Sequence, residues 1–245
     1  MEIPKEPSRS FQVIKTAPLG WFTLTFLVLP TGGSHPPSSS PNPSYHTNRL
    51  PPNLLPWRWW IPPSMLFYDG AVRQQTPSEE TLVGGVVARG GGGWKGVNIT
   101  VDVAGKDGDP ETRGTTVVTQ KGWERLYDLP IPAGQGGGSA DGNAGRSLVW
   151  KGTMQAIRQI RSEDGAKTHP RFGPCNGNLK LVEAENPEQI LAIWENRTDW
   201  TVLGNLLIYG DFEGRDLEMV ILSCMGVVCC ERITGRGVWG GIFKR

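Results

Sequence analysis

The sequence predicts a mainly β fold in which an antiparallel barrel closes around one apolar C-terminal helix. From residue 64 onward, short apolar or alternating segments are separated by turns that contain Gly, Pro or Asp, a pattern typical of strands. Near the C-terminus, residues 216–233 are expected to form a helix whose central run, Met219–Cys230, is apolar on every side. A helix of this kind is buried in protein or in a membrane, and a sheet closed into a barrel provides a protein interior for it.

The first strands are expected where the Pro-rich composition ends. Residues 64–68 (SMLFY) end at an Asp-Gly turn, and residues 81–88 (TLVGGVVA) form an apolar run interrupted by glycines. Val97–Val103 (VNITVDV) alternates, so its apolar side chains share one face. Residues 115–120 (TTVVTQ) follow a turn and are the next strand candidate.

Further strands are expected around a Gly-rich loop in the middle of the chain. Residues 124–131 (ERLYDLPI) precede this loop and are limited by Pro130, and residues 147–151 (SLVWK) follow it. Residues 154–161 (MQAIRQIR) are ambiguous between strand and helix.

A hairpin and one more strand are expected just before the helix. Residues 178–183 (NLKLVE) and 189–195 (QILAIWE) are separated by an Asn-Pro turn, which predicts a hairpin. Residues 201–209 (TVLGNLLIY) form the last strand, with Gly204 as a candidate β-bulge. The barrel domain is therefore expected over residues 64–235.

The expected helix contains an apolar run that is too short to cross a membrane. Between Met219 and Cys230 the only polar side chain is Ser223. As a helix this run would be about 18 Å long, whereas a hydrocarbon core is roughly 30 Å thick. The length therefore favours burial inside the protein. No nucleophile elbow surrounds Ser223, so a catalytic role is not expected. Because the apolar run buries its hydroxyl, that hydroxyl is expected to bond to a carbonyl one turn back.

Both ends of the helix carry terminating signals. Asp216 is a suitable N-cap, and its carboxylate also suits the positive end of the helix dipole. Arg232 lies near the C-terminal end, where a cation is favoured, and Gly235 lies where a helix-terminating glycine belongs. Residues 236–245 (RGVWGGIFKR) are expected to be a loose C-terminal tail.

Residues 1–63 are expected to be a disordered or poorly ordered N-terminal region. Within it, residues 19–29 (LGWFTLTFLVL) follow basic residues and resemble the core of a signal peptide. Glu2, Glu6 and Pro18 argue against that interpretation. The alternatives are a stray hydrophobic segment, a lone strand, or an artefact of the chosen gene start.

The second half of this N-terminal region has the composition of a linker. Residues 30–63 are rich in Pro, Ser and Asn and lack a helical or strand period. Trp57, Trp59 and Trp60 stand beside an arginine within this segment. These tryptophans either dock on a partner or a membrane interface, or fold back over the domain.

The composition favours reduced thiols and gives no sign of a metal or nucleic-acid site. Three of the four cysteines lie in the apolar run, where a free cysteine behaves as a small hydrophobe. The net charge of +1 gives no reason to expect a nucleic acid. No zinc-ligand spacing occurs, so we expect no metal or cofactor. Reduced thiols favour a cytoplasmic location, either free or at the membrane periphery, with secretion as the alternative. The cysteines and histidines are Cys175, Cys224, Cys229, Cys230, His35, His46 and His169.

No catalytic, cofactor-binding or metal site is assigned from the sequence. Residues 84–93 are Gly-rich but lack the GxxxxGK[ST] order of a phosphate loop. The acidic residues of the turn after residue 101 lack EF-hand spacing, so a solvated hairpin is expected there. The other polar groups considered are assigned to turns, a helix cap or glycosylation sequons that matter only in a secreted chain. The acidic residues considered are Asp102, Asp107, Asp109, Glu111, Asp211, Glu213 and Asp216, and the asparagines of the two sequons are Asn98 and Asn196.

Several antiparallel strands followed by one wholly apolar helix is an unusual order. The segments that form this order are residues 178–182 (NLKLV), 189–194 (QILAIW), 204–209 (GNLLIY) and 217–232 (LEMVILSCMGVVCCER). In these segments the C-terminal half is similar to uncharacterised fungal members of the tubby C-terminal and LURP-one-related superfamily. The resemblance implies a tubby-like barrel threaded by the helix, whereas residues 64–177 match only in strand pattern.

The resemblance also implies a binding role rather than an enzymatic one. Phosphoinositide-binding members of that superfamily use clustered Lys and Arg on the barrel surface, and no matching cluster is found in this sequence. The basic residues of the expected barrel are dispersed, with surface solvation as their default role. The ones considered are Lys95, Arg113, Lys121, Arg125 and Lys151.

Three functional hypotheses follow from the sequence. The first is a non-enzymatic binding module for membrane phospholipid headgroups or for a protein partner. The second is a secreted β-rich protein with a lectin-like or cell-wall role, based on residues 19–29 and the two sequons. The third is a membrane-anchored protein that uses one of the two apolar segments. The sequence names no ligand-binding residue and no oligomeric state.

Overall fold

The computed structural model describes residues 6–15, 26–30, 45–49, 64–69, 82–90, 97–104, 113–120, 125–133, 145–152, 178–197 and 202–233. These residues form antiparallel strands and one C-terminal helix, so the prediction of a mainly β fold is confirmed. The strands are β1 (Arg9–Lys15), β2 (Phe26–Pro30), β3 (Tyr45–Arg49), β4 (Ser64–Asp69), β5 (Leu82–Gly90), β6 (Val97–Val103), β7 (Gly114–Gln120), β8 (Leu126–Ile131), β9 (Arg146–Gly152), β10 (Leu179–Glu183), β11 (Ile190–Asn196) and β12 (Val202–Ile208).

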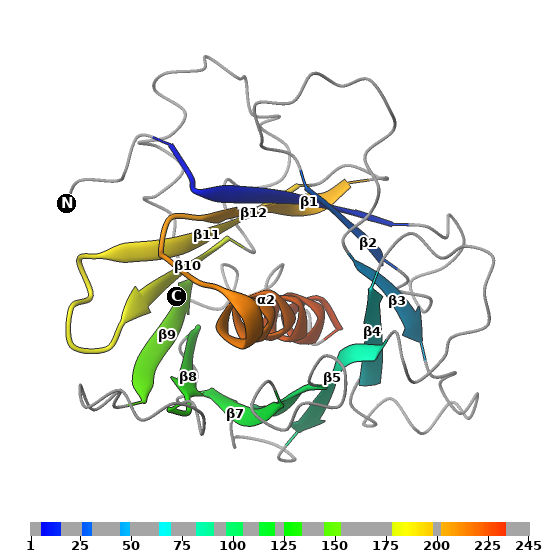
Figure 1. Ribbon diagram of the computed structural model, residues 1–245, viewed down its shortest axis with the longest axis horizontal. Helices are drawn as coiled ribbons and strands as arrows, with labels where there is room; N and C mark the ends of the chain where they lie inside the picture. Colours follow the sequence, from blue (N-terminus) through cyan, green and yellow to red (C-terminus); the bar gives the residue numbers. More distant parts are fainter. Residues whose placement is uncertain are drawn as a thin grey trace, which may run out of the picture.

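Each strand pairs with its neighbours in the chain, and the first strand joins the two ends of the sheet. β1 pairs with β2 on one side and with β12 on the other, which closes the strand order into a barrel. Figure 1 shows the strands arranged around the helix α2 (Gly214–Ile233). Within the described ranges, the β2–β3 and β7–β8 seams are the shortest, because each is joined at only two paired positions.

The barrel interior is filled by α2 and by inward-facing strand residues. Every α2 residue from Leu217 to Glu231 is buried, so the helix has no face in water. Val97–Val103 alternates between buried and exposed or half-buried positions, and its apolar side chains face the core as predicted. The apolar helix therefore serves as the core around which the strands close. In the described part of the chain, no helix is long and apolar enough to cross a membrane.

The helix approaches β5 and β6 closely at a glycine. A Cβ atom added at Gly226 would lie 2.8 Å from both Val86 Cγ1 and Ile99 Cγ2, closer than real Cβ contacts allow. Gly84 of β5 also leaves room for the helix, since an added Cβ would lie 2.8 Å from Leu222 Cδ1. Glycine is therefore required where the helix backbone meets these two strands.

The start of α2 differs from the prediction, whereas its end agrees. The helix begins at Gly214, so Asp216 lies in the first turn and the prediction that it is the N-cap is wrong. The carbonyl of Glu213 accepts from the backbone N–H groups of Asp216 (3.1 Å) and Leu217 (3.4 Å), which places Glu213 at the cap position. Gly214 has a φ of 48°, a left-handed conformation that glycine adopts without steric cost.

The expectation of disorder throughout residues 1–63 is wrong for three segments, which form β1, β2 and β3 of the barrel. In β1 the side chains of Phe11 and Val13 are buried in the core, and this alternation over a short run is the signal that the prediction missed. β2 overlaps the end of residues 19–29, the segment for which a lone strand was one alternative. The barrel is therefore not confined to residues 64–235, and residues 16–25, 31–44 and 50–63 lie outside the described residues.

The later strands lie close to their predicted positions. Val97–Val103 matches the predicted range, and the other strands from β4 to β12 begin and end near the predicted boundaries. The predicted bulge is confirmed, because Val13 and Ile14 of β1 lie opposite Gly204 and Val202 of β12, with Leu203 between them left over. The ambiguous segment 154–161 and the tail 236–245 lie outside the described residues.

Candidate functional site

A buried ion pair ties the C-terminal turn of α2 to the start of β8. The guanidinium of Arg125 donates from Nε to Oε1 and from Nη2 to Oε2 of Glu231, both at 2.7 Å. The Tyr127 hydroxyl donates to Glu231 Oε1 at 2.9 Å. The side chain of Glu231 is 3% exposed and that of Arg125 is 23% exposed, so the prediction that Arg125 is solvated on the surface is wrong.

The pKa shifts of this cluster favour a charged Arg125 and a neutral Tyr127. Burial alone would lower the pKa of Arg125, but its hydrogen bonds to Glu231 and the charge of that carboxylate outweigh burial and raise it. Burial raises the pKa of Tyr127 well above its usual value, and the neighbouring Glu231 raises it further. The arginine therefore stays charged and the tyrosine stays neutral, which suits a structural clamp rather than proton transfer.

Ser223 has a structural role inside the barrel. Its hydroxyl donates to the carbonyl of Val220 at 3.0 Å, which confirms the predicted bond one turn back. It also accepts from the indole Nε1 of Trp150 on β9 at 3.0 Å. Both partners are buried, so this pair fixes the rotation of α2 relative to β9.

The cysteines of α2 are buried and free. Cys224, Cys229 and Cys230 form no disulfide, which agrees with their prediction as core thiols, and Cys175 lies outside the described residues. Burial raises the pKa of the Cys224 thiol, and the neighbouring Cys229 and Glu231 raise it further. This thiol is therefore held in its unreactive protonated form.

The acidic groups considered from the sequence are not brought together. Asp102 is exposed on β6, and Asp211 and Glu213 are exposed before α2, where Arg9 Nη2 lies 3.9 Å from Glu213 Oε1. Asp216 pairs with its neighbour Arg215 at 3.4 Å. Within the described ranges, no group of His, Cys, Asp and Glu is arranged to hold a metal ion. The remaining candidates Asp107, Asp109, Glu111, Lys95, Lys121, His35 and His169 lie outside those ranges.

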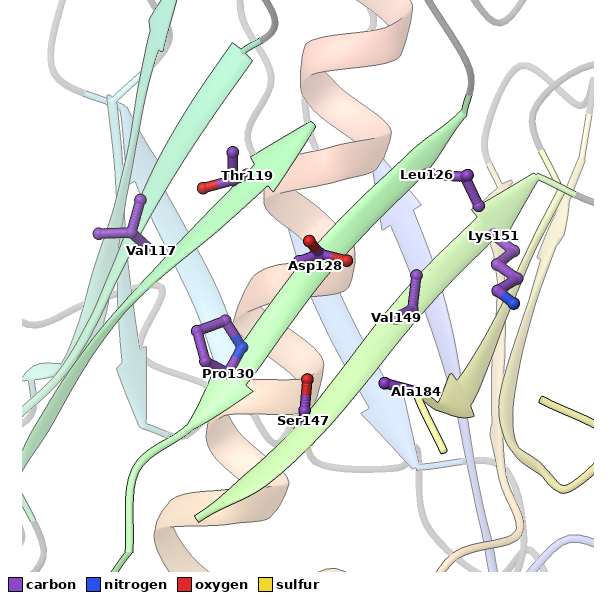
Figure 2. A pocket seen from close by; sticks show the side chains of 9 residues that line it. All are labelled: Val117, Thr119, Leu126, Asp128, Pro130, Ser147, Val149, Lys151 and Ala184. Carbon is purple, nitrogen blue, oxygen red and sulfur yellow. The ribbon is translucent and has the colours of Figure 1, made fainter. Parts of the chain in front are cut away.

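The candidate functional site is a groove of about 600 Å³ on the outer face of β7, β8 and β9. Figure 2 shows its side chains on the side of the sheet that faces away from α2. The groove is therefore separated from the core by the sheet itself. Its lining residues are Val117, Thr119, Leu126, Asp128, Pro130, Ser147, Val149, Lys151 and Ala184.

Lys151, a lining residue of this groove, stands side by side with Lys180, which does not itself line it. Lys151 lines the groove from β9 and lies directly opposite Lys180 of β10. Burial, and then the neighbouring charge of Lys151, lower the pKa of Lys180. Among the ion pairs of the described residues, none involves either lysine. An anionic group placed between the two ammonium groups would relieve their repulsion.

The wall beside the lysines is apolar. Val149 lines the groove and also belongs to a second hydrophobic cluster with Val182, Ile190 and Ile193, which is separate from the main core. Leu126, another lining residue, packs against the same cluster. Apolar side chains therefore lie next to the two lysines on the outer face, which suits a ligand with apolar groups and a negative charge.

The β7–β8 seam is interrupted where it borders the groove. Only Thr119 with Asp128, and Gln120 with Tyr127, are paired across it. Pro130 follows in β8 and has no N–H to donate. The Pro130 carbonyl accepts a hydrogen bond from the Thr116 hydroxyl rather than from a backbone N–H.

Most residues of this groove were not predicted from the sequence. Val117, Thr119 and Lys151 were on predicted strands, and their alternation could have placed them on the outer face. The pairing of Lys151 with Lys180 could not be read from the sequence, because it depends on the register of two strands separated by a long connection. Arg113, another of the dispersed basic residues, is exposed but does not line the groove.

Comparisons with known proteins leave the family open. No protein-family model matches the sequence, and a search of curated proteins found no match.

Proposed function

We propose that this chain is a non-enzymatic binding module with a tubby-like barrel, and that its outer groove holds a segment of a protein partner. The proposal is supported by the arrangement of the barrel, in which the interior is filled by α2 and the groove lies on the outside. The observation that carries it is the lysine pair beside an apolar wall. Such a surface suits a peptide with apolar side chains and at least one carboxylate.

The shape and charge of the groove favour a peptide over a lipid surface. The groove is a depression between strands, and Asp128 contributes a carboxylate to its lining. A negative charge at this position weakens attraction to an anionic membrane but is compatible with a peptide that carries both charges. Val117, which is 41% exposed, offers an apolar contact at the same groove.

A phospholipid headgroup is the second candidate, favoured by the same lysine pair. A phosphate group could contact both ammonium groups, which lie on adjacent strands. This candidate agrees with the family resemblance in the C-terminal half. Its distinguishing property would be binding to vesicles that contain phosphoinositide but not to vesicles of phosphatidylcholine alone.

The test uses the full chain, a library of random dodecapeptides, and vesicles with and without phosphoinositide. We expect selected peptides to contain Asp or Glu and to bind more weakly as salt rises, because exposed charges are screened. Replacing both lysines (Lys151→Gln with Lys180→Gln) should weaken peptide binding about five- to tenfold. Arg113→Gln, which removes an exposed cation away from the groove, is the matched control and should leave binding unchanged.

The other outcomes are equally informative. Salt-sensitive binding to phosphoinositide vesicles that is lost with the two lysine replacements, without any selected peptide, would favour the headgroup candidate. If the chain selects no peptide and binds neither kind of vesicle, the proposed function is wrong. Binding that Arg113→Gln weakens as much as the paired lysine replacements would place the ligand elsewhere on the barrel.

A further inference from the structure

Lys151 and Lys180 point to the same side of the sheet. Lys180 of β10 lies between Leu179 and Leu181, which are both buried in the main core, so its own side chain faces outward. Lys151 of β9 lies directly opposite and lines the groove on that outer face (Figure 2). The two amino groups therefore share one side of the barrel wall.

The spacing of the two strands holds these lysines close together. Ala184 N–H donates to the Ser147 carbonyl across the β9–β10 seam, which makes these opposed residues a hydrogen-bonded pair. Such pairs recur at every second residue, so Lys180 and Lys151 also form one, with Cα atoms about 5.5 Å apart. A small ligand can therefore contact both amino groups at once.

The next residues in the same row of side chains are aliphatic. Leu126 of β8 lies opposite Lys151, and Ile193 of β11 lies opposite Lys180. Ile193 is fully buried, so Lys180 stands between a cation and an apolar wall, whereas Lys151 borders the groove. Burial, and then the charge of Lys151, lower the pKa of Lys180, because both favour the neutral amine.

Carboxylates on the neighbouring strands do not neutralise the lysine pair. Glu183 of β10 pairs with Arg146 at 2.7 Å, and Glu195 of β11 accepts from the amide of Asn205. Asp128 lines the groove from β8, but within the described ranges no ion pair joins it to either lysine. The arrangement is therefore an amine beside a second cation, which is one way in which a lysine is activated as a nucleophile.

We propose that Lys180 is an acylation site whose donors are acyl phosphates, and that acylation weakens binding at the groove. An acyl phosphate carries its electrophilic carbon and its anionic phosphate within one small group, so it matches two amines on adjacent strands. The Lys151 ammonium binds the phosphate and stabilises its charge as it leaves. The regulatory part of this inference rests on the proposed function, whereas the modification itself does not.

The acylation step balances without a further reactant. The lone pair of the neutral Lys180 nitrogen attacks the acyl carbon and forms a C–N bond. The bond between that carbon and the phosphate oxygen breaks, and its electron pair leaves with the phosphate. The nitrogen gives up one proton, which the phosphate takes up, so the products are an amide and hydrogen phosphate. Because the amide is uncharged, the groove loses one of its two neighbouring cations.

Acetyl phosphate and mass spectrometry test the modification site on the full chain. In the native protein we expect Lys180 to be acetylated about fivefold faster than the average of the other lysines. In urea this preference should disappear, because unfolding separates the two strands. A native protein in which Lys180 reacts no faster than the other lysines would overturn the inference.

Variants at Lys151 and a second donor test the chemical class of the donor. Lys151→Gln removes the cation that binds the phosphate and should slow acetylation of Lys180 about fivefold, whereas Lys151→Arg should retain most of the rate. An N-hydroxysuccinimide ester of acetic acid carries no phosphate, so Lys151→Gln should slow that reaction less. Equal slowing with both donors would show that the phosphate is not recognised and that acyl phosphates are the wrong class.

The effect on binding is measured with a peptide selected from the dodecapeptide library. Acetylation of Lys180 should weaken binding of that peptide about threefold. Lys180→Arg keeps a cation and offers no amine at this position. Treatment of this variant with acetyl phosphate should therefore leave its own peptide affinity unchanged.

The outcomes separate the modification from the proposed function. Selective acetylation of Lys180 with unchanged peptide affinity would overturn the regulatory part and leave the modification site. No peptide binding by the untreated chain would overturn the proposed function and the regulatory part, while the acetylation rates would still decide the site. Loss of affinity in the treated Lys180→Arg variant would assign the effect to another lysine and overturn the regulatory role of Lys180.

Discussion

The ion pair between Arg125 and Glu231 fixes the position and rotation of the central helix within the barrel. Its two hydrogen bonds of 2.7 Å are bidentate, a geometry that fixes both distance and orientation. Tyr127 and the carbonyl of Asn178 supply further hydrogen bonds to the same pair. A helix with apolar side chains on all sides has few other features that distinguish one rotation from another, so this pair and Ser223 provide that specificity.

Removing one charge of this pair should therefore be costly. Glu231→Gln leaves the guanidinium of Arg125 largely buried without a counter-charge, and the free energy of unfolding should fall by about 3 kcal/mol or more. Glu183→Gln is the matched control, because its partner Arg146 forms a pair in which both side chains are about one-third exposed. That change should cost at most about 1 kcal/mol in urea denaturation. Equal losses for the two variants would contradict the role given to Glu231.

At the scale of elements, the contact between α2 and the β5–β6 hairpin depends on glycine. Helix propensity alone favours Ala over Gly in a helix interior by about 1 kcal/mol. Overpacking opposes this with a cost of about 1–3 kcal/mol. The Cβ distances of 2.8 Å to Val86 and Ile99 indicate that overpacking is the larger effect at Gly226.

Gly226→Ala is therefore expected to destabilise the protein by up to about 2 kcal/mol, measured by chemical denaturation. The loss should be smaller in a Val86→Ala background, because that change removes one of the two atoms that the new methyl group meets. Effects that simply add in the double variant would show that the two sites do not touch.

At the scale of the whole molecule, the barrel and the helix should unfold together. α2 has no face suited to water, and its burial requires the closed strand order. The strands likewise need the helix to fill the interior of a wide barrel. Without the helix the described strands keep only the small outer cluster around Val149, and the helix alone buries nothing, which predicts a single cooperative transition.

The buried thiols report this transition. In a Cys175→Ser background, the thiols of α2 should be protected from a thiol reagent in the native protein without detergent. They should become reactive over the same range of urea in which far-ultraviolet circular dichroism is lost. Labelling at lower urea would mean that the helix leaves the barrel before the strands separate.

The strands from β4 onward and the helix could be predicted because their signals are local. Alternation in Val97–Val103 and the apolar run from Met219 to Cys230 depend only on neighbouring residues. The start of the helix could not be predicted as well, because Gly214 begins it through a left-handed conformation that no periodicity reveals. β1 was missed because its short run lies in a Pro-rich and polar region, and its role depends on pairing with β12 at the far end of the chain.

By itself the sequence determined that the protein is mainly β and that one apolar helix must be buried, because both follow from side-chain periodicity and length. Only the tertiary structure decided how the distant parts meet. Strand register brought Lys151 beside Lys180, and closure of the sheet brought Arg125 to Glu231. These contacts depend on long-range pairing, which residue patterns do not encode locally. The candidate groove therefore emerged only when the strands were placed side by side.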